Sequence, residues 1–163
     1  MRPRFLQLLQ ALDRHAVDFV VVGGVAAILE GAPITTLDLD FVYRVEAGNL
    51  ERLAATLAEL EARYRDPAGR QIEPTATRLE ANRVNLLETR LGLLDAMQEI
   101  GAAWTYDDLF PRSRARAVAD LTVRVLELAA VIESKEVAGR EKDLAMLPVL
   151  RRTLEMLKSN SQA

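Results

Sequence analysis

Two aspartates stand one residue apart in an apolar segment of the sequence. The segment reads LDLDFVY, in which Asp38 and Asp40 alternate with Leu37, Leu39 and Phe41. If it forms a β-strand, both carboxylates point to one face, roughly 7 Å apart, and the apolar side chains point to the other. Carboxylates at this separation repel each other, and burying either one alone is costly. A divalent cation removes both penalties, and Mg²⁺ suits the task because it binds one or two carboxylates together with waters and phosphate oxygens.

A glycine pair lies upstream of the aspartates, with 13 residues between Gly24 and Asp38. Gly23 and Gly24 follow the apolar run DFVVV and precede the segment VAAILE. Glycine lets a backbone approach a phosphate closely, and the amide groups at the start of a helix attract negative charge. A phosphate site beside a metal-binding acid pair is the arrangement used for phosphoryl or nucleotidyl transfer. Alone, a glycine pair is usually a tight turn and alternating acids are usually the solvated face of an edge strand, so the hypothesis depends on their combination.

The elements that position these residues alternate between strand and helix. Apolar spacing predicts strands over residues 18–22, 37–43, 84–89, 91–97 and 115–125, and helices over residues 5–15, 25–30, 49–63, 106–110 and 126–158. The expected buried stripe of the third helix is Leu50, Leu53, Leu57 and Leu60. This order predicts an α+β fold, close to α/β, with a small mixed sheet flanked by helices.

The length of 163 residues favours a single domain. We expect it to span residues 1–158, with a core over 17–126, C-terminal helices over 127–158 and a flexible polar tail over 159–163. Gly139 and Pro148 are expected to break the C-terminal helices.

The middle of the chain permits two interpretations. Residues 78–100 can be drawn as one long helix or as a pair of strands. Gly92 and the turn-like pair Thr89 and Arg90 favour the strands.

Composition excludes several classes of protein. The longest uncharged apolar run, residues 19–29, has 11 residues, whereas a membrane-spanning helix needs about 20. The absence of cysteine excludes disulfides and thiolate metal sites. The formal net charge is −3, and the six arginines against four acids between Arg63 and Arg90 are only a slight local excess. We therefore expect a cytoplasmic protein that has no membrane partner and does not attract polyanions over its whole surface.

The N-terminal pattern resembles the polymerase-beta-like nucleotidyltransferase superfamily. An apolar run, GG, alanine, a short helix, a further glycine and the motif TxDLDF follow one another here, as they do in that superfamily. Its minimal bacterial members, the small-molecule (lincosamide-type) enzymes and the abortive-infection toxin nucleotidyltransferases, are most similar, closely over the first 45 residues. The resemblance implies the nucleotidyltransferase fold, with Gly23, Gly24 and Thr36 on the nucleotide and Asp38 and Asp40 on magnesium.

The resemblance also implies a third acid on a neighbouring strand, which binds metal and activates the attacking hydroxyl. The segment TRLGLLDAM matches the context of that acid, so Asp95 is assigned to the role. The alternatives are Glu88 and Glu99. Taken without the resemblance, Asp95 is an ordinary surface acid on a strand or helix.

The segment IESKEVAGREKDLAML is similar to the C-terminal helices of the toxin-type members. This similarity implies that Lys135 contacts a phosphate, that Arg140 and Lys142 lie nearby, and that Asp143 orients one of these cations. Without the similarity, the segment would be interpreted as a solvated helix face.

The implied activity is transfer of a nucleoside monophosphate from a nucleoside triphosphate to an acceptor hydroxyl, with one or two Mg²⁺ ions. The acceptor is open: a protein or a tRNA end for the toxin of a toxin–antitoxin pair, or a small molecule such as an antibiotic. A non-catalytic nucleotide-binding or partner-binding member of the fold is a further alternative, and homo-oligomerisation is left open. The sequence departs from the family pattern at two positions, since many members have serine at the position of Gly24 and toxin-type members often have arginine at the position of Val25. These differences bear on triphosphate affinity and on the choice of substrate.

Overall fold

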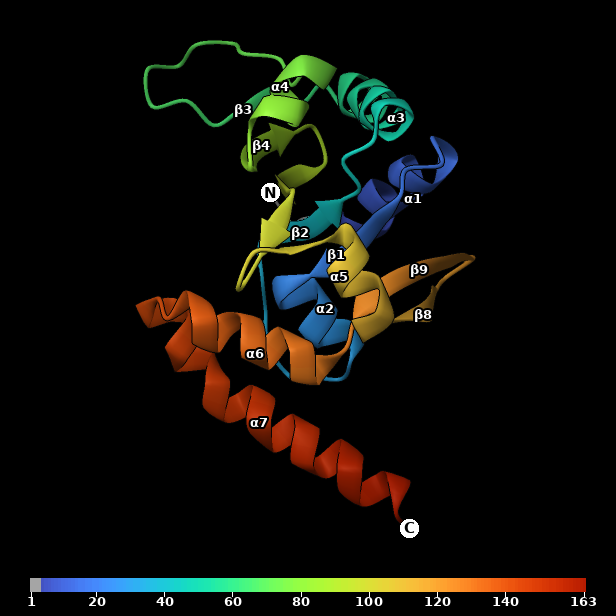
Figure 1. Cartoon of the computed structure of the whole chain (residues 1–163), viewed down its shortest axis with the longest axis vertical. Helices are drawn as coiled ribbons and strands as arrows, with labels where there is room; N and C mark the ends of the chain where they lie inside the picture. Colours follow the sequence, from blue (N-terminus) through green and yellow to red (C-terminus); the bar gives the residue numbers. More distant parts are fainter. Residues whose placement is uncertain (1–3) are drawn as a thin grey trace.

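The computed structural model describes residues 4–163 and is built on a seven-stranded mixed sheet (Figure 1). The strand order is β3-β4-β5-β2-β1-β9-β8, and β6 and β7 form a separate two-stranded sheet. The strands are β1 (Phe19–Val22), β2 (Asp38–Tyr43), β3 (Arg63–Tyr64), β4 (Val84–Thr89), β5 (Gly92–Met97), β6 (Glu99–Ile100), β7 (Trp104–Thr105), β8 (Ser113–Val118) and β9 (Leu121–Leu126). The helices are α1 (Phe5–Arg14), α2 (Gly23–Leu29), α3 (Ala47–Glu59), α4 (Ala76–Ala81), α5 (Tyr106–Leu109), α6 (Leu128–Ala138) and α7 (Glu141–Ser161). The predicted α+β class is confirmed.

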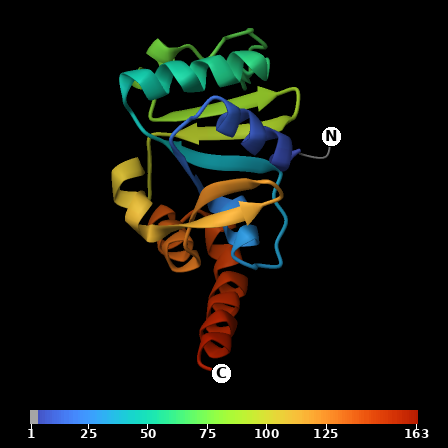
Figure 2. The ribbon, with the colours of Figure 1, turned by 90° about the vertical axis from the view of Figure 1, so that its right-hand side faces the viewer.

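Helices cover both faces of the sheet. Figure 2 shows α1 in front of the sheet and α6 behind the β8–β9 hairpin; α1 packs against α3, and α2 packs against α6. The predicted stripe of α3 is buried, as are Leu39 and Phe41 of β2. Leu37, expected on the same strand face as Leu39 and Phe41, lies outside the strand, because β2 begins only at Asp38, and it is 67% exposed. The apolar face of β2 therefore packs in the core, and its other face carries the aspartates.

The pairing of β1, β2 and β5 determines what lies beside the aspartates. β1 pairs with β2 in antiparallel register, with Val22 opposite Asp40. β2 pairs with β5 in parallel register, with Asp40 opposite Asp95. Because directly paired residues of neighbouring strands point to the same face, the register alone places these two carboxylates side by side.

The middle of the chain is a hairpin, and the single-helix interpretation is wrong. β4 and β5 pair in antiparallel register, with Thr89 opposite Gly92. α3 ends at Glu59 instead of continuing to Arg63, because Glu61 adopts a left-handed backbone (φ 54°) and Arg63 begins β3. The sequence predicts neither β3 nor α4, since a strand of two residues is too short to show alternation.

The C-terminal helices separate at Gly139, as predicted, where the backbone takes a φ of 63°. Pro148 does not break α7, which continues through it. A proline leaves the carbonyl four residues earlier without its donor, and Leu144 at that position is 49% exposed, so water can replace the donor. α7 also includes residues 159–161 of the expected tail, and Figure 2 shows the helix extending away from the sheet. No helix within residues 4–163 combines the length and apolar character needed to cross a membrane.

A buried hydrogen-bond network joins α4 to the strands that carry the acids. The Tyr43 hydroxyl, at the end of β2, donates to the carbonyl of Leu79 in α4 at 2.6 Å. The side-chain amide of Asn85 in β4 donates to the Tyr43 hydroxyl at 3.1 Å and to the carbonyl of Ala96 in β5 at 3.2 Å. Burial raises the pKa of Tyr43 to about 12, so the hydroxyl keeps its proton. The network therefore fastens β2, β4 and β5 together.

Substitution of Tyr43 by Phe is expected to lower the free energy of unfolding by about 1–3 kcal/mol, because the buried Leu79 carbonyl and Asn85 amide each lose a partner. Urea denaturation followed by circular dichroism measures this change. Tyr106→Phe is the matched control, because Tyr106 is only partly buried, and it is expected to cost less than about 0.5 kcal/mol. Equal losses in the two variants would contradict the role of the network.

Candidate functional site

Three carboxylates from β2 and β5 lie close together on one face of the sheet. Asp38, Asp40 and Asp95 each bring one oxygen to within 4.8 Å of the others. Strand alternation aligns the first two, and the β2–β5 register adds the third. The three acids expected from the sequence are thus brought together. The alternatives for the third acid are not part of this group, since Glu99 lies elsewhere in the same cleft and Glu88 lines a different pocket.

The donor set of this group fits a divalent cation. Asp40 Oδ1 is buried and has no hydrogen-bond partner among residues 4–163. Burial, followed by the charges of Asp95 and Asp38, raises the pKa of Asp40 to about 7. Burial also raises the pKa of Asp95, although the nearby Arg65 opposes this effect. Oxygen ligands of this number and charge are those of a hard cation such as Mg²⁺, which stabilises all three carboxylates in their ionised form.

The glycine pair begins α2 directly beside the carboxylates. Gly23 has a φ of 62°, and a Cβ atom there would lie 2.3 Å from Asp40 Oδ2, so a side chain would displace the carboxylate. A Cβ atom on Gly24 would lie 2.9 Å from Thr36 Cβ and 3.0 Å from Thr36 Oγ1. The serine that many members of the resembled superfamily have at the position of Gly24 would therefore collide with Thr36.

A charged cluster from α6 and α7 lines the same cleft. Lys135 Nζ donates to Asp143 Oδ1 at 3.2 Å, and Arg140 Nε donates to Asp143 Oδ2 at 2.6 Å. The side chains of Lys135 and Asp143 are only 13% and 3% exposed, so the interpretation as a solvated helix face is wrong for these two. Burial favours a higher pKa for Asp143, but hydrogen bonds from Arg140 and Lys135 outweigh it and lower the pKa. Ionised Asp143 thus holds both cations, and Lys142 lies in the same lining.

The cleft has a volume of about 530 Å³ and two chemically different sides. The side formed by α2, α6 and α7 holds the glycines and the cations. On the other side of Asp95, the lining from β4, β5 and the segment after them includes Val84, Leu86, Met97, Ile100 and Ala103. Val84 and Leu86 are 52% and 45% exposed. Exposed apolar side chains inside a cleft are typical of a ligand contact surface.

Arg65 belongs to the site, although no pattern in the sequence predicts it. The Arg65 guanidinium hydrogen-bonds and ion-pairs with Asp95 Oδ1. Arg65 directly follows β3, and its backbone N–H donates to the Leu86 carbonyl at 3.0 Å, which extends the sheet by one residue. The only signal in the sequence is the slight excess of arginine between residues 63 and 90, which does not single out Arg65.

Sequence comparisons identify no relative, because no family model and no curated protein matches the chain. Solved structures match most of its length. ANT(2")-Ia in complex with adenylyl-2"-tobramycin is 17% identical with a TM-score of 0.60, over 96% of this chain and 91% of that one. The lincosamide antibiotic adenylyltransferase LnuA, bound to lincomycin, is 13% identical with a TM-score of 0.61, over 90% and 94%.

A protein of Thermotoga maritima, TM1012, provisionally assigned as a nucleotidyltransferase, is 17% identical with a TM-score of 0.56, over 96% of each chain. At identities this low, structural similarity establishes the fold and leaves the activity to be argued from the site. The chain has the nucleotidyltransferase fold, as the resemblance in its first 45 residues predicted.

Proposed function

We propose that the protein is a magnesium-dependent nucleotidyltransferase. The observation that carries the proposal is the convergence of Asp38, Asp40 and Asp95 in one cleft with Gly23 and Lys135. In the proposed reaction, an acceptor hydroxyl oxygen bonds to the α-phosphorus of a nucleoside triphosphate. The bond from that phosphorus to the bridging oxygen breaks, and pyrophosphate leaves with the electron pair.

The three carboxylates have different roles in the proposed reaction, according to their positions. Asp38 and Asp40 would hold one or two Mg²⁺ ions, which when bound neutralise the triphosphate and the charge that develops as the bond breaks. Asp95 lies beside Asp40 and next to the apolar side of the cleft, where an acceptor would bind. It is therefore placed to share a cation and to accept the hydroxyl proton.

The remaining residues position the triphosphate. The backbone of Gly23 and Gly24 lies directly against Asp40 and Thr36, so the N–H groups at the start of α2 and the Thr36 hydroxyl can donate to phosphate oxygens of a nucleotide bound beside Asp40. Lys135 supplies a charge-assisted donor from α6, and Asp143 fixes its direction. Arg140, held by the same carboxylate, adds a second cation.

A small hydroxylated molecule is the acceptor that the cleft favours. Val84 and Leu86 offer apolar surface beside Asp95, while the cations Lys135, Arg140 and Lys142 come from the α6–α7 side. An RNA acceptor would need cations along the acceptor path, and the one arginine in that part of the lining, Arg83, is paired with a glutamate at 3.5 Å. ANT(2")-Ia and LnuA, whose structures contain an adenylylated tobramycin and lincomycin, show that this fold accommodates such acceptors.

A toxin that modifies a protein or a tRNA end, with an antitoxin partner, remains the second form of the proposal within this chemistry. Pyrophosphate release with lincomycin, tobramycin, bulk tRNA and a bacterial protein extract as separate acceptors distinguishes the two. Triphosphate binding without release in any arm would favour a non-catalytic binding protein.

Calorimetry with ATP, GTP, CTP and UTP is expected to detect binding of at least one nucleotide that requires Mg²⁺. Asp38→Asn and Asp40→Asn are each expected to weaken it about 100-fold or more, because the cation loses a charged ligand. Asp107→Asn, which changes a side chain that is 78% exposed, should bind as the wild type does. Unchanged binding in both site variants would contradict the metal centre.

Lys135→Ala is expected to weaken nucleotide binding about tenfold to 100-fold, through the loss of one charge-assisted hydrogen bond. The fold should tolerate the change because Arg140 continues to pair with Asp143. Lys158→Ala, near the end of α7, removes the same charge from an exposed site and should have no effect. Equal affinities of the two variants would exclude Lys135 from the nucleotide site.

The pH dependence of stability tests the repulsion between the carboxylates. Asp40 binds its proton more tightly in the folded protein, with a pKa of about 7, than at its ordinary value of 3.8. Metal-free protein should therefore lose stability as the pH rises from about 4 to 7. Asp40→Asn removes this penalty and is expected to raise the melting temperature at pH 8 by at least about 2 °C, with the gain disappearing near pH 4.

Thermal melts at pH 4 and pH 8 measure this gain, with Asp107→Asn as the control that should show none. Added Mg²⁺ should stabilise the wild type at pH 8 and stabilise Asp40→Asn much less. A lower melting temperature of Asp40→Asn at pH 8 would show that Asp40 is not under electrostatic strain.

A further inference from the structure

One cation makes direct contact with the carboxylate group. Among residues 4–163, Arg65 is the only residue outside the three acids whose side chain hydrogen-bonds to a carboxylate of Asp38, Asp40 or Asp95, and it does so at Asp95 Oδ1. Lys135 lies close enough for its charge to act on Asp40, but its hydrogen bond goes to Asp143. The three acids therefore differ in their surroundings, since only one of them already has a cationic partner.

The backbone fixes the approach of Arg65. Asp40, Asp95 and Leu86 are neighbours across β2, β5 and β4, and Arg65 is hydrogen-bonded to Leu86 at the end of β3. The Arg65 side chain must therefore extend past Leu86 to reach Asp95, and it is only 29% exposed. Sheet pairing, and not a mobile loop, brings this arginine to the acid.

The contact competes with metal binding. The Arg65 guanidinium occupies the position from which a metal cation would approach Asp95 Oδ1. The guanidinium and the metal cation are both positive, so they repel each other at this distance. Asp38 and Asp40 have no such partner. The centre is thus divided into a pair that can hold a cation as it stands and a third acid that is already engaged.

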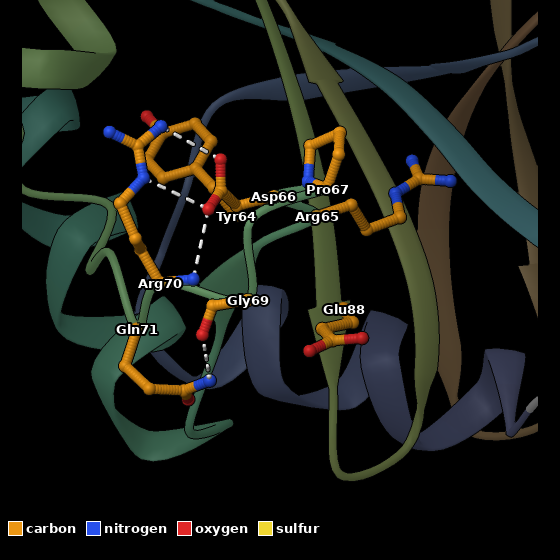
Figure 3. Close-up of a pocket in the computed structure, with 8 residues that line it drawn as sticks. All are labelled: Tyr64, Arg65, Asp66, Pro67, Gly69, Arg70, Gln71 and Glu88. Atoms are coloured by element: carbon orange, nitrogen blue, oxygen red, sulfur yellow. Dashed lines mark hydrogen bonds and ion pairs between the residues drawn. The ribbon is translucent and has the colours of Figure 1, made fainter.

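A second pocket gives Arg65 somewhere to move. It has a volume of about 350 Å³, and Arg65 and Glu88 are both in its lining. In Figure 3 the Arg65 guanidinium points away from Tyr64, Asp66 and Arg70 of this pocket. Glu88 lies two residues after Leu86 on β4, so its carboxylate is on the same face of the strand and can accept the guanidinium once it leaves Asp95.

We propose that Arg65 is a positioning residue that competes with the divalent cation for Asp95. It keeps Asp95 oriented beside Asp40 and lowers the cation affinity of any site that includes Asp95. Its release into the pocket that contains Glu88 makes the third carboxylate available. This inference rests on the proposed function, because it concerns the same metal centre.

Titration with Mn²⁺ alone, with free Mn²⁺ measured by electron paramagnetic resonance, tests the proposal without turnover. Arg65→Met keeps the apolar stem, removes the charge, and is expected to lower the Kd for Mn²⁺ about tenfold. The gain should disappear when Asp95→Asn is added, because it arises at Asp95. Asp95→Asn in the wild-type background should change the Kd little. Arg65→Lys keeps the positive charge beside Asp95 and should retain the wild-type Kd within about threefold.

The same strand supplies a matched control. Arg63 is two residues away on the same face, is 30% exposed and pairs with Glu73 at 3.2 Å, so Arg63→Met should change the Kd less than about twofold. Circular dichroism verifies folding, and Arg65→Gln, which keeps a donor without the charge, repeats the test if the Met variant does not fold.

The outcomes separate this role from the proposed function. An unchanged or higher Kd in Arg65→Met, a gain that survives Asp95→Asn, or an equal gain in Arg63→Met would each overturn the role of Arg65. If no protein with Asp38 and Asp40 intact binds Mn²⁺, the metal centre fails and the proposed function fails with it.

Discussion

Three carboxylates that repel one another lie side by side at the centre of the cleft. The parallel register of β2 and β5 places Asp40 beside Asp95, and strand alternation adds Asp38. A sheet that brings these groups together without a cation stores unfavourable free energy, as the raised pKa of Asp40 indicates. The folded chain tolerates this cost because the fully buried apolar face of β2 and the Tyr43–Asn85 network hold the same strands from the other side. The carboxylates that the proposed reaction needs therefore lower the stability of the same strands that hold them.

The residues around the carboxylates are closely packed against one another. Only glycine fits at position 23, because a Cβ atom would meet the Asp40 carboxylate, and the Thr36 side chain fills the space beside Gly24. Any side chain at position 24 would have to displace the Thr36 side chain. On the far side, Asp143 holds Lys135 and Arg140 with one carboxylate. The side chains of the site are thus held in one orientation by the residues that they contact.

Local signals made much of this predictable from the sequence. The alternation of LDLDFVY and the glycine pair after a β-branched run are patterns within single elements, and they located Asp38, Asp40 and Gly23. Asp95 was assigned from the resemblance of the segment TRLGLLDAM to the superfamily, and not from a local signal. The hairpin on which it lies was favoured by Gly92 and by the turn-like pair Thr89 and Arg90. Arg65 could not be found, because its contact arises from the pairing of a two-residue strand with β4. The predicted helix break at Pro148 is wrong for a related reason. Whether a proline ends a helix depends on whether water can reach the carbonyl four residues earlier, and the sequence does not show that exposure.

The proposed reaction requires a divalent cation held by Asp38 and Asp40, with Asp95 beside them, next to a triphosphate site. Anomalous diffraction at the manganese edge, from crystals grown with Mn²⁺ and an α,β-methylene nucleoside triphosphate, tests it directly. We expect an anomalous peak in contact with carboxylate oxygens of both Asp38 and Asp40, with the triphosphate lying against Gly23 and Gly24. A peak elsewhere, or a triphosphate bound away from the glycine pair, would contradict it.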